Sequence, residues 1–402
     1  MSDPEANPYL PRGDWYSLPA VTAQGAGRRG PSHREGDGLV RRTERLGIPL
    51  GIFAASRAAV FAALFLILRL PGVGKAGRFL SAGQGTSFLG VAAHGYPHAL
   101  AKPPAPSGLA FFPLYPMLVR ALHKATGISF LRSGLAIGLV ASALAMVVLW
   151  LIVERVTDQH TASRTIVLLS FFPWGFVFSM TYADGLVLLL CAICLLALLD
   201  EQWITAGLAA LLAGMAGFLG AMLVLPCAWA AARRFRRYGS EALFAPFLAP
   251  LGAVGFFFYL RLRTGNPLAA FKAQRAGLTY GGIGLHPGAA WHTLWATITH
   301  PTVHLNALTS ILALLLVAGA VVLMVQWRPP LILWLYAAPI LLVAVWFNTF
   351  LALPRLALAA FPLFIAAARR LRGPAFWAVA AASASLMTGL LLVAGGTTLL
   401  VP

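Results

Sequence analysis

One carboxylate stands between two apolar runs of this sequence, where its type and place allow acid–base chemistry. Residues 171–190 read FFPWGFVFSMTYADGLVLLL, and Asp184 is the only carboxylate among them. An acid between membrane-depth segments is costly to bury and marks a functional site by default, and it can accept a proton from a hydroxyl. Asp184 could instead cap a helix beginning at Gly185, since Asp is a favoured N-cap residue. The two roles do not exclude each other.

A second candidate is the polar segment 83–97, GQGTSFLGVAAHGYP, which follows the first long apolar run. It lies in a loop of residues 71–107 that is rich in Gly, Pro and His. Loops of this length are usually functional or disordered. The segment contains no carboxylate, but Gln84 could hydrogen-bond a hydroxyl group.

Cations at two later places could hold a phosphate group. The stretch 263–274 reads RTGNPLAAFKAQ, in which a Thr-Gly-Asn-Pro turn should lead into a short helix with Lys272 and Arg275 on neighbouring faces. Arg355 follows a proline at the start of LPRLALAAFPLF. Phosphate binding and the snorkelling of long basic side chains to the membrane surface both explain such residues.

The remaining reactive side chains indicate no metal or nucleotide site. His300 and His304 have a helical spacing but straddle Pro301, and neither has a nearby carboxylate. Cys191 and Cys194 form a C-x-x-C pair inside an apolar run, where helix packing is the expected role. No Walker sequence, dinucleotide fingerprint or G-x-S-x-G is present.

The composition is that of an all-α polytopic membrane protein. Of 402 residues, 59% are hydrophobic and 10% are charged, and the mean hydropathy is +0.79. This excludes a soluble enzyme, because apolar runs of about 20 residues recur along the chain. The net charge of +18 suits basic cytoplasmic loops and anionic lipids, or a phosphate-bearing substrate. Nucleic acid is not an expected partner, since no soluble basic module is present.

The chain should divide into a disordered cytoplasmic tail, residues 1–46, and a transmembrane domain, residues 47–402. The tail is polar and rich in Gly, Pro and Arg. About 10–12 helices are expected; their spans lie near 48–70, 108–124, 132–154, 163–181, 183–199, 203–232, 243–262, 304–326, 329–348, 353–368 and 375–400.

The basic clusters predict the orientation in the cell membrane. If all of them are cytoplasmic, the N-terminus is cytoplasmic and the loops at about 71–107 and 263–303 are on the outer side. The clusters are Arg41, Arg42 and Arg45; Arg120, Lys124 and Arg132; Arg233 to Arg237; Arg328; and Arg369 to Arg372.

The middle of the chain leaves two orientations open. Counting every span places Asp184 on the cytoplasmic side. If segment 203–232 is instead two short helices broken near residues 217–220, Asp184 moves to the outer side.

The motifs taken in order resemble the bacterial PIG-V-like family, polytopic mannosyltransferases of the GT-C superfamily. The resemblance extends over about residues 48–370. Its motifs are ASRAAVF (55–61), VAAHGYP (91–97), LAFFPLYPMLVRAL (109–122), FFPWGFVFSMTYADGLVLLL (171–190), GAMLVLPCAW (220–229), RTGNPLAAFKAQ (263–274) and LPRLALAAFPLF (353–364).

The resemblance implies transfer of mannose, or another hexose, from a polyprenyl-phosphate sugar to a lipid or protein acceptor at the outer membrane face. It implies no further cofactor. Such a reaction needs a carboxylate that takes the proton of the acceptor hydroxyl, and cations that hold the phosphate. The implied substrate-binding residues are Tyr115, Tyr182, Asn266, Lys272, Gln274, Arg275 and Arg355.

The chain departs from the family pattern where the catalytic acid is expected. Gln84 stands at the position of the family's first-loop Asp, and an amide cannot accept a proton at neutral pH. Asn266 replaces the acid of a Gly-Asp-Pro, whereas Asp184 keeps a family acid and Arg355 a family cation. Two interpretations remain: an active enzyme with Asp184 as base and Gln84 orienting the acceptor, or a degenerate member that binds polyprenyl-phosphate lipids as a binder, transporter or scaffold.

Overall fold

The computed structural model describes residues 32–67, 69, 79–99, 108–276, 295, 299, 305–346 and 353–396. The chain divides into two compact units, Met1–Glu44 and Arg45–Pro402. Most of the predicted tail falls outside the described residues, and its disorder stays a prediction. Helix α1 (Ser32–Ile67) begins within the last part of that segment.

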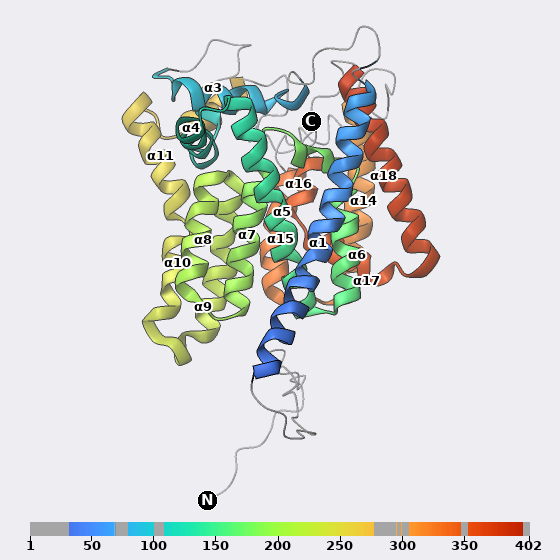
Figure 1. The fold of residues 1–402 in the computed structure, drawn as a ribbon. Coiled ribbons are helices and arrows are strands. Elements are labelled where there is room, and N and C mark those ends of the chain that lie inside the picture. The colour runs from blue at the N-terminus through green and yellow to red at the C-terminus, as the bar shows by residue number, and fades with distance from the viewer. Residues whose placement is uncertain are drawn as a thin grey trace, which may run out of the picture. The chain divides into compact units, whose positions relative to one another are not determined.

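The described elements of the larger unit are all helices, which confirms the all-α class (Figure 1). After α1 the helices are α3 (Gln84–His94), α4 (Leu114–Thr126), α5 (Phe130–Val156), α6 (Gln159–Ser170), α7 (Asp184–Leu199), α8 (Trp203–Ala216), α9 (Val224–Tyr238), α10 (Phe244–Leu248), α11 (Leu251–Thr264), α12 (Ala269–Ala276), α14 (Leu305–Trp327), α15 (Leu331–Trp346), α16 (Leu353–Ala359), α17 (Pro362–Arg370) and α18 (Gly373–Gly396).

Four short 3₁₀ helices interrupt this series: η1 (Gly108–Ala110), η2 (Gly175–Ser179), η3 (Phe218–Leu223) and η4 (Gly239–Leu243). Irregular backbone of this kind is tolerated at membrane depth only where protein buries it or water reaches it. The breaks η2 and η3 stand on either side of the α7–α8 pair, so they shorten the helices beside Asp184.

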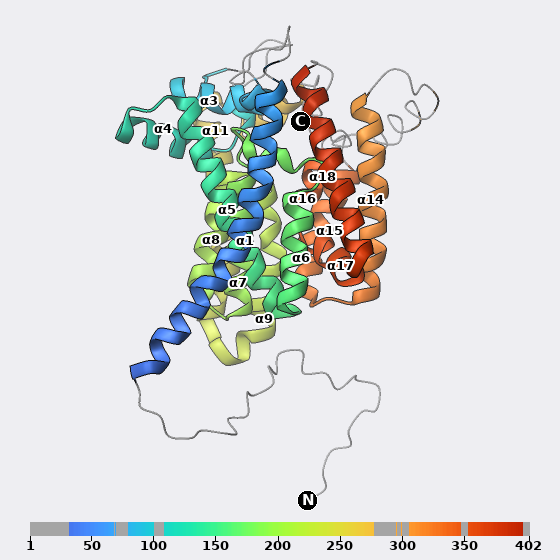
Figure 2. The same cartoon turned by 45° about the vertical axis from the view of Figure 1, so that its right-hand side comes forward.

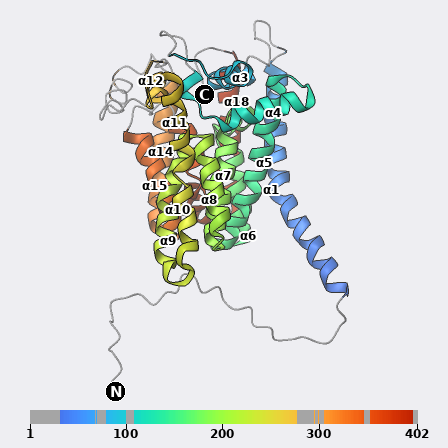
Figure 3. The same ribbon diagram turned by 90° about the vertical axis from the view of Figure 1, so that its left-hand side faces the viewer.

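Several helices are long and apolar enough to cross a bilayer. Among the described residues, four segments are both long and apolar enough, and four shorter helices are apolar as well. The four long segments are Arg45–Leu66, Phe130–Val156, Phe218–Thr264 and Gly373–Leu392, and the shorter ones are Asp184–Leu199, Trp203–Ala216, Ile311–Trp327 and Leu331–Ala344. The run Phe218–Thr264 is folded on itself, because α9 and α11 form two antiparallel arms joined through η4 and α10 (Figure 3).

Helix α7 lies at the centre of the bundle. It packs against α5 and α8, and residues 185–192 are all buried. A helix that is apolar on every side belongs in such an interior. Gly185 allows the close approach of α5, since a Cβ there would lie 2.1 Å from Ser142 Oγ. The start of α7 is therefore fixed tightly against its neighbour.

Helices α3, α4 and α12 lie at one end of the bundle, across the ends of the longer helices (Figure 3; α3 and α4 also in Figure 2). The prediction of a span at 108–124 was wrong. Helix α4 is 13 residues long and carries polar residues along one face, and its Arg120 donates hydrogen bonds to the Ala92 and Val91 carbonyls of α3 at 2.6 and 3.2 Å.

This position of α4 also corrects the orientation argument. Arg120 and its neighbours lie at the same end as the loop that contains α3, so the basic clusters cannot all lie on one side of the membrane. A cytoplasmic N-terminus stays a prediction.

Of the two possibilities for segment 203–232, the structure shows the one with a break near residues 217–220. Helix α8 ends at Ala216, η3 covers Phe218–Leu223, and α9 then returns in the opposite direction. Because α4 does not span the bundle, Asp184 lies at the same end as segment 83–97. The backbone of Thr181 confirms this, because its N–H donates to the Leu80 carbonyl at 3.0 Å.

Candidate active site

Three polar side chains from distant parts of the sequence meet at the end that holds α3. Arg355 of α16 connects the other two. Its Nη2 donates to Gln84 Oε1 at 3.1 Å, and its Nε lies 3.1 Å from Asp184 Oδ1. We call Gln84, Asp184 and Arg355 the polar triad. The triad joins the two segments that the sequence marked for chemistry.

Each member of the polar triad stands at the beginning of a helix. Gln84 is the first residue of α3, Asp184 the first of α7, and Arg355 lies in the first turn of α16. Helix N-termini carry partial positive charge, which favours anions such as the Asp184 carboxylate or a phosphate group.

Asp184 does not cap its helix. Ala183 is the N-cap of α7, and no side chain hydrogen-bonds the end of that helix. The interpretation of Asp184 as a capping residue is therefore wrong. The carboxylate is about one fifth exposed, like Arg355, with side-chain exposures of 21% and 18%. A small polar group can thus reach both.

Tyr182 supports the triad from below. Its ring lies 5.4 Å from the guanidinium carbon of Arg355, a cation–π distance. Its hydroxyl donates to the Ala82 carbonyl at 2.9 Å, directly before α3. Tyr182 therefore ties the Asp184 segment to the Gln84 segment and contacts the cation that both share.

The first turn of α3 packs closely on the backbone before Asp184. The Thr181 hydroxyl donates to the Leu80 carbonyl at 3.2 Å. A Cβ at Gly85 would lie 2.4 Å from Thr181 Oγ1, so only glycine fits there without movement. This contact determines how near Gln84 lies to Asp184.

Tyr115 of α4 packs against α3. It is fully buried, its hydroxyl donates to the Gly134 carbonyl at 2.9 Å, and its ring packs edge-on against Phe88. Burial raises the pKa of Tyr115 well above its usual value, and the negative charge of Asp184 raises it further. These contacts show that Tyr115 supports α3.

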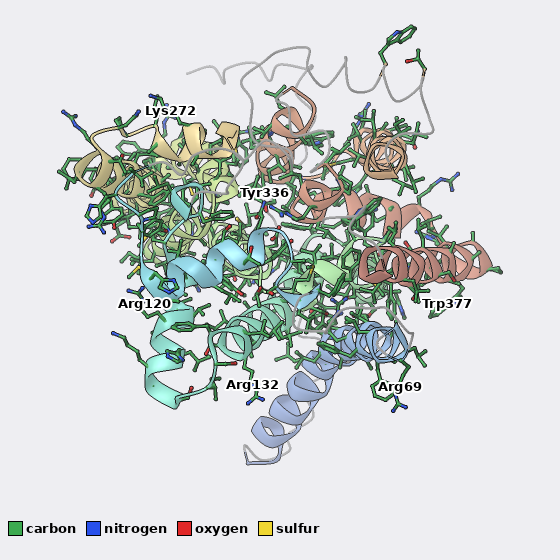
Figure 4. The ribbon with its side chains drawn as sticks, turned by 90° about the horizontal axis from the view of Figure 1, so that it is seen from above. Arg69, Arg120, Arg132, Lys272, Tyr336 and Trp377 are labelled. Carbon is green, nitrogen blue, oxygen red and sulfur yellow. The ribbon has the colours of Figure 1, made fainter. Side chains whose placement is uncertain are left out.

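The predicted residues around α12 lie apart from the triad. Asn266 Oδ1 accepts the Leu268 N–H at 2.9 Å, which closes the predicted turn before α12. Lys272 is exposed and stands at the edge of this end of the molecule (Figure 4). No described contact joins either residue to Gln84, Asp184 or Arg355. Gln274 and Arg275 belong to α12, but their side chains lie outside the described part.

Sequence reasoning overlooked Arg57, although a cation inside an apolar span is itself a signal. Arg57 is 5% exposed and donates to the carbonyls of Gly175 at 2.7 Å and Ser170 at 2.9 Å, and to Ser179 Oγ at 3.0 Å. No carboxylate among the described residues pairs with it. Arg57 thus binds α1 to the irregular backbone that leads to Asp184.

The end that holds the triad is poor in acid. Asp184 is the only carboxylate among the side chains described there, because the other described carboxylates lie at or after the opposite ends of α5, α7 and α9 (Figure 1). Those are Glu154, Asp158, Asp200, Glu201 and Glu241. If the described part of this end has a base, it is Asp184.

The arrangement can perform three chemical tasks. A carboxylate with limited exposure can accept a proton, and a guanidinium beside it can hold a phosphate oxygen. Gln84 can orient a hydroxyl group between them.

Comparison with known proteins supports the fold. The structure is similar to the crystal structure of ArnT from Cupriavidus metallidurans bound to undecaprenyl phosphate, with a TM-score of 0.52 and 15% sequence identity. The match covers 85% of this chain and 63% of the ArnT chain. The chain therefore has a helical fold like that of ArnT, and it spans less than two thirds of the ArnT length.

The sequence comparisons add no family. No family model matches the chain, and no curated protein matches it either. Membership of the PIG-V-like mannosyltransferases stays a prediction.

Proposed function

We propose that this protein is a membrane glycosyltransferase that transfers mannose, or another hexose, from a polyprenyl-phosphate sugar to a lipid or protein acceptor. The observation that carries the proposal is the meeting of Gln84, Asp184 and Arg355. The fold of ArnT, whose crystal structure contains undecaprenyl phosphate, supports a lipid-linked donor. The motif resemblance supports mannose as the sugar.

In the proposed reaction the acceptor hydroxyl oxygen attacks the anomeric carbon of the donor sugar. The bond from that carbon to the phosphate oxygen breaks, and polyprenyl phosphate leaves with the bonding electron pair. Asp184 accepts the hydroxyl proton, Gln84 orients the hydroxyl, and Arg355 stabilises the charge that develops on the phosphate.

A transfer assay tests this proposal. Purified protein in proteoliposomes receives radiolabelled polyprenyl-phosphate mannose and a membrane lipid extract, and labelled product is counted. Asp184→Asn should lower product formation by about 10²- to 10⁴-fold, because it removes the proton acceptor. The matched variant Glu201→Gln changes a carboxylate at the other end of α7 and should keep the rate. Equal rates for wild type and Asp184→Asn would remove Asp184 from the mechanism.

A second function has its own observation. Arg355 neutralises Asp184, and Gln84 stands where the family has its acid, so the site could bind a polyprenyl phosphate without catalysing transfer. This degenerate binder, transporter or scaffold predicts saturable binding of the lipid and no product from the wild-type protein at any donor concentration.

A further inference from the structure

The Arg355 guanidinium contacts two partners, and most of its N–H donors have no hydrogen bond to either of them. Its Nη2 has a hydrogen bond to Gln84 Oε1. Its Nε lies 3.1 Å from Asp184 Oδ1, but the contact lacks hydrogen-bond geometry, so this buried atom has no hydrogen-bond acceptor. Arginine has five N–H donors. Most of them are therefore unused in the described part of the site.

The Asp184 carboxylate likewise has unused hydrogen-bond acceptors in the described part of the site. No described residue donates a hydrogen bond to it, and among the described side chains Arg355 is the one cation that it pairs with. Carboxylates and phosphates both prefer a paired, charge-assisted contact with guanidinium. A phosphate group can make that contact with Arg355, whereas Asp184 in its present position cannot.

Because residue 84 is an amide, Asp184 is the one described carboxylate that competes with a phosphate group for Arg355. Gln84 is neutral, so its amide oxygen can leave the guanidinium without uncovering a negative charge. In the described part of the site, the negative charge that a phosphate must displace is that of Asp184. Binding of the phosphate to Arg355 therefore requires release of the Asp184 carboxylate.

We infer that Arg355 exchanges Asp184 for the phosphate group of a polyprenyl phosphate, and that this exchange frees the carboxylate to accept a proton. The inference rests on the proposed function and adds the order in which donor and acceptor bind. The donor binds first, and the acceptor hydroxyl meets an active base only afterwards. Without donor, Asp184 stays paired and the site is inactive.

The exchange makes a prediction that a simple binding site does not. If Asp184 competes with phosphate for one guanidinium, removing its charge strengthens phosphate binding. An ion pair of this exposure is worth little, so the expected gain in affinity for Asp184→Asn is about 3- to 10-fold. If Asp184 instead helps to hold the ligand, the same variant weakens binding.

The experiment measures the dissociation constant of a short-chain polyprenyl phosphate for the full chain in detergent, without any acceptor. Wild type, Asp184→Asn, Gln84→Asp and Arg355→Gln are compared with Glu201→Gln as the matched control. The expected order of affinity is Asp184→Asn above wild type, Gln84→Asp below it, and Arg355→Gln at least about 10-fold below it. Glu201→Gln should equal wild type.

Additional titrations identify the ligand, and a second variant replaces Asp184→Asn if that protein does not fold. Phosphatidate and inorganic phosphate are titrated in parallel; tight binding of either, with no advantage for the polyprenyl chain, would overturn the assignment of the ligand. Should Asp184→Asn not purify as a single species, Gln84→Asp decides, because a second carboxylate beside Arg355 must weaken phosphate binding.

The two proposals can fail separately. Affinity that is unchanged or weaker in Asp184→Asn, or unchanged in Gln84→Asp, would overturn the exchange. The expected affinities together with no sugar transfer by wild type would retain the exchange and reject the transferase.

Discussion

Two carboxylate–arginine clusters lie at opposite ends of α7, and they differ in how fully the acid is paired. Glu201, just beyond the end of α7, contacts Arg234 at 2.9 Å and Arg237 at 3.7 Å and also accepts the Tyr238 hydroxyl hydrogen. Asp184, at the start of α7, forms an ion pair with Arg355 and, among the described residues, has no second cation and accepts no hydrogen bond. A carboxylate whose oxygens are all paired stabilises the loop that it joins. A carboxylate with a single partner can still interact with a ligand.

The local backbone agrees with this difference. Glu201 has a φ of 58°, an uncommon value for a residue other than glycine, and its three contacts hold it there. The first turn of α7 is regular, so Asp184 is free of such strain. The Glu201 cluster serves the fold, and we propose that the polar triad serves the chemistry.

The largest expected gain in transfer rate comes from placing an acid at position 84. Gln84→Asp places a second carboxylate beside Arg355 and should raise the transfer rate at saturating donor by about 10- to 100-fold, since a general base contributes about 10² or more. The rate is measured with radiolabelled donor. Gln84→Asn keeps an amide and serves as the control. No rise in rate would mean that segment 83–97 no longer forms the site.

A smaller loss should follow from moving α3. In Gly85→Ala the new Cβ would lie 2.4 Å from Thr181 Oγ1, which shifts Gln84 away from Asp184 and should lower the transfer rate about tenfold. Gly90→Ala is the matched control on the same helix, because a Cβ there meets nothing within 4 Å. Similar rates for the two variants would show that the position of α3 does not matter.

Beyond the other end of α7, replacing an acid by its amide should lower the stability of the protein and leave the transfer rate unchanged. Glu201→Gln removes a partly exposed acid from two arginines and should lower the free energy of unfolding by about 1 kcal/mol. Thermal unfolding in detergent and the transfer assay are run on one preparation. A loss of transfer with unchanged stability would reverse the roles assigned to the two clusters.

The smallest effect is expected at Asp158, the N-cap of α6. Its carboxylate accepts the Thr161 N–H at 2.9 Å and the Thr161 hydroxyl at 2.7 Å. Asp158→Ala should lower the free energy of unfolding by about 0.5–1 kcal/mol. Asp158→Ser keeps a capping oxygen and should recover most of it.

The pH dependence of this cap has a defined sign. Desolvation acts to raise the pKa of Asp158, but the hydrogen bonds from Thr161 and the charge of Arg164 lower it below its usual value. The stabilisation is therefore complete above the unfolded pKa of about 3.9 and is lost as the pH falls through the lower folded value. Asp158→Ser should lack this acid dependence, and an identical acid profile for both proteins would contradict the assignment.

The helical class could be predicted from the sequence because hydropathy reports directly on burial in lipid. The break before α9 was recognisable from its glycines. Helix α4 was predicted wrongly as a span because length and hydropathy were weighed above periodicity. Its polar residues Arg120, His123 and Lys124 follow the 3.6-residue repeat of an amphipathic helix.

The candidate site was only partly predictable. Asp184, Gln84 and Arg355 were recognised from their residue types and motifs, but their meeting depends on helix order and on close contacts such as Gly85 with Thr181. Neither follows from local spacing. Asn266 shows the opposite case, since its turn was predictable and its side chain is used within that turn.

A cryo-EM structure of the protein with a bound short-chain polyprenyl phosphate tests the central claim most directly. The account predicts phosphate oxygens at hydrogen-bond distance, about 3 Å, from the Arg355 guanidinium, with the Asp184 carboxylate turned away from it. A phosphate held near Lys272 on α12, with the Asp184–Arg355 contact unchanged, would contradict it.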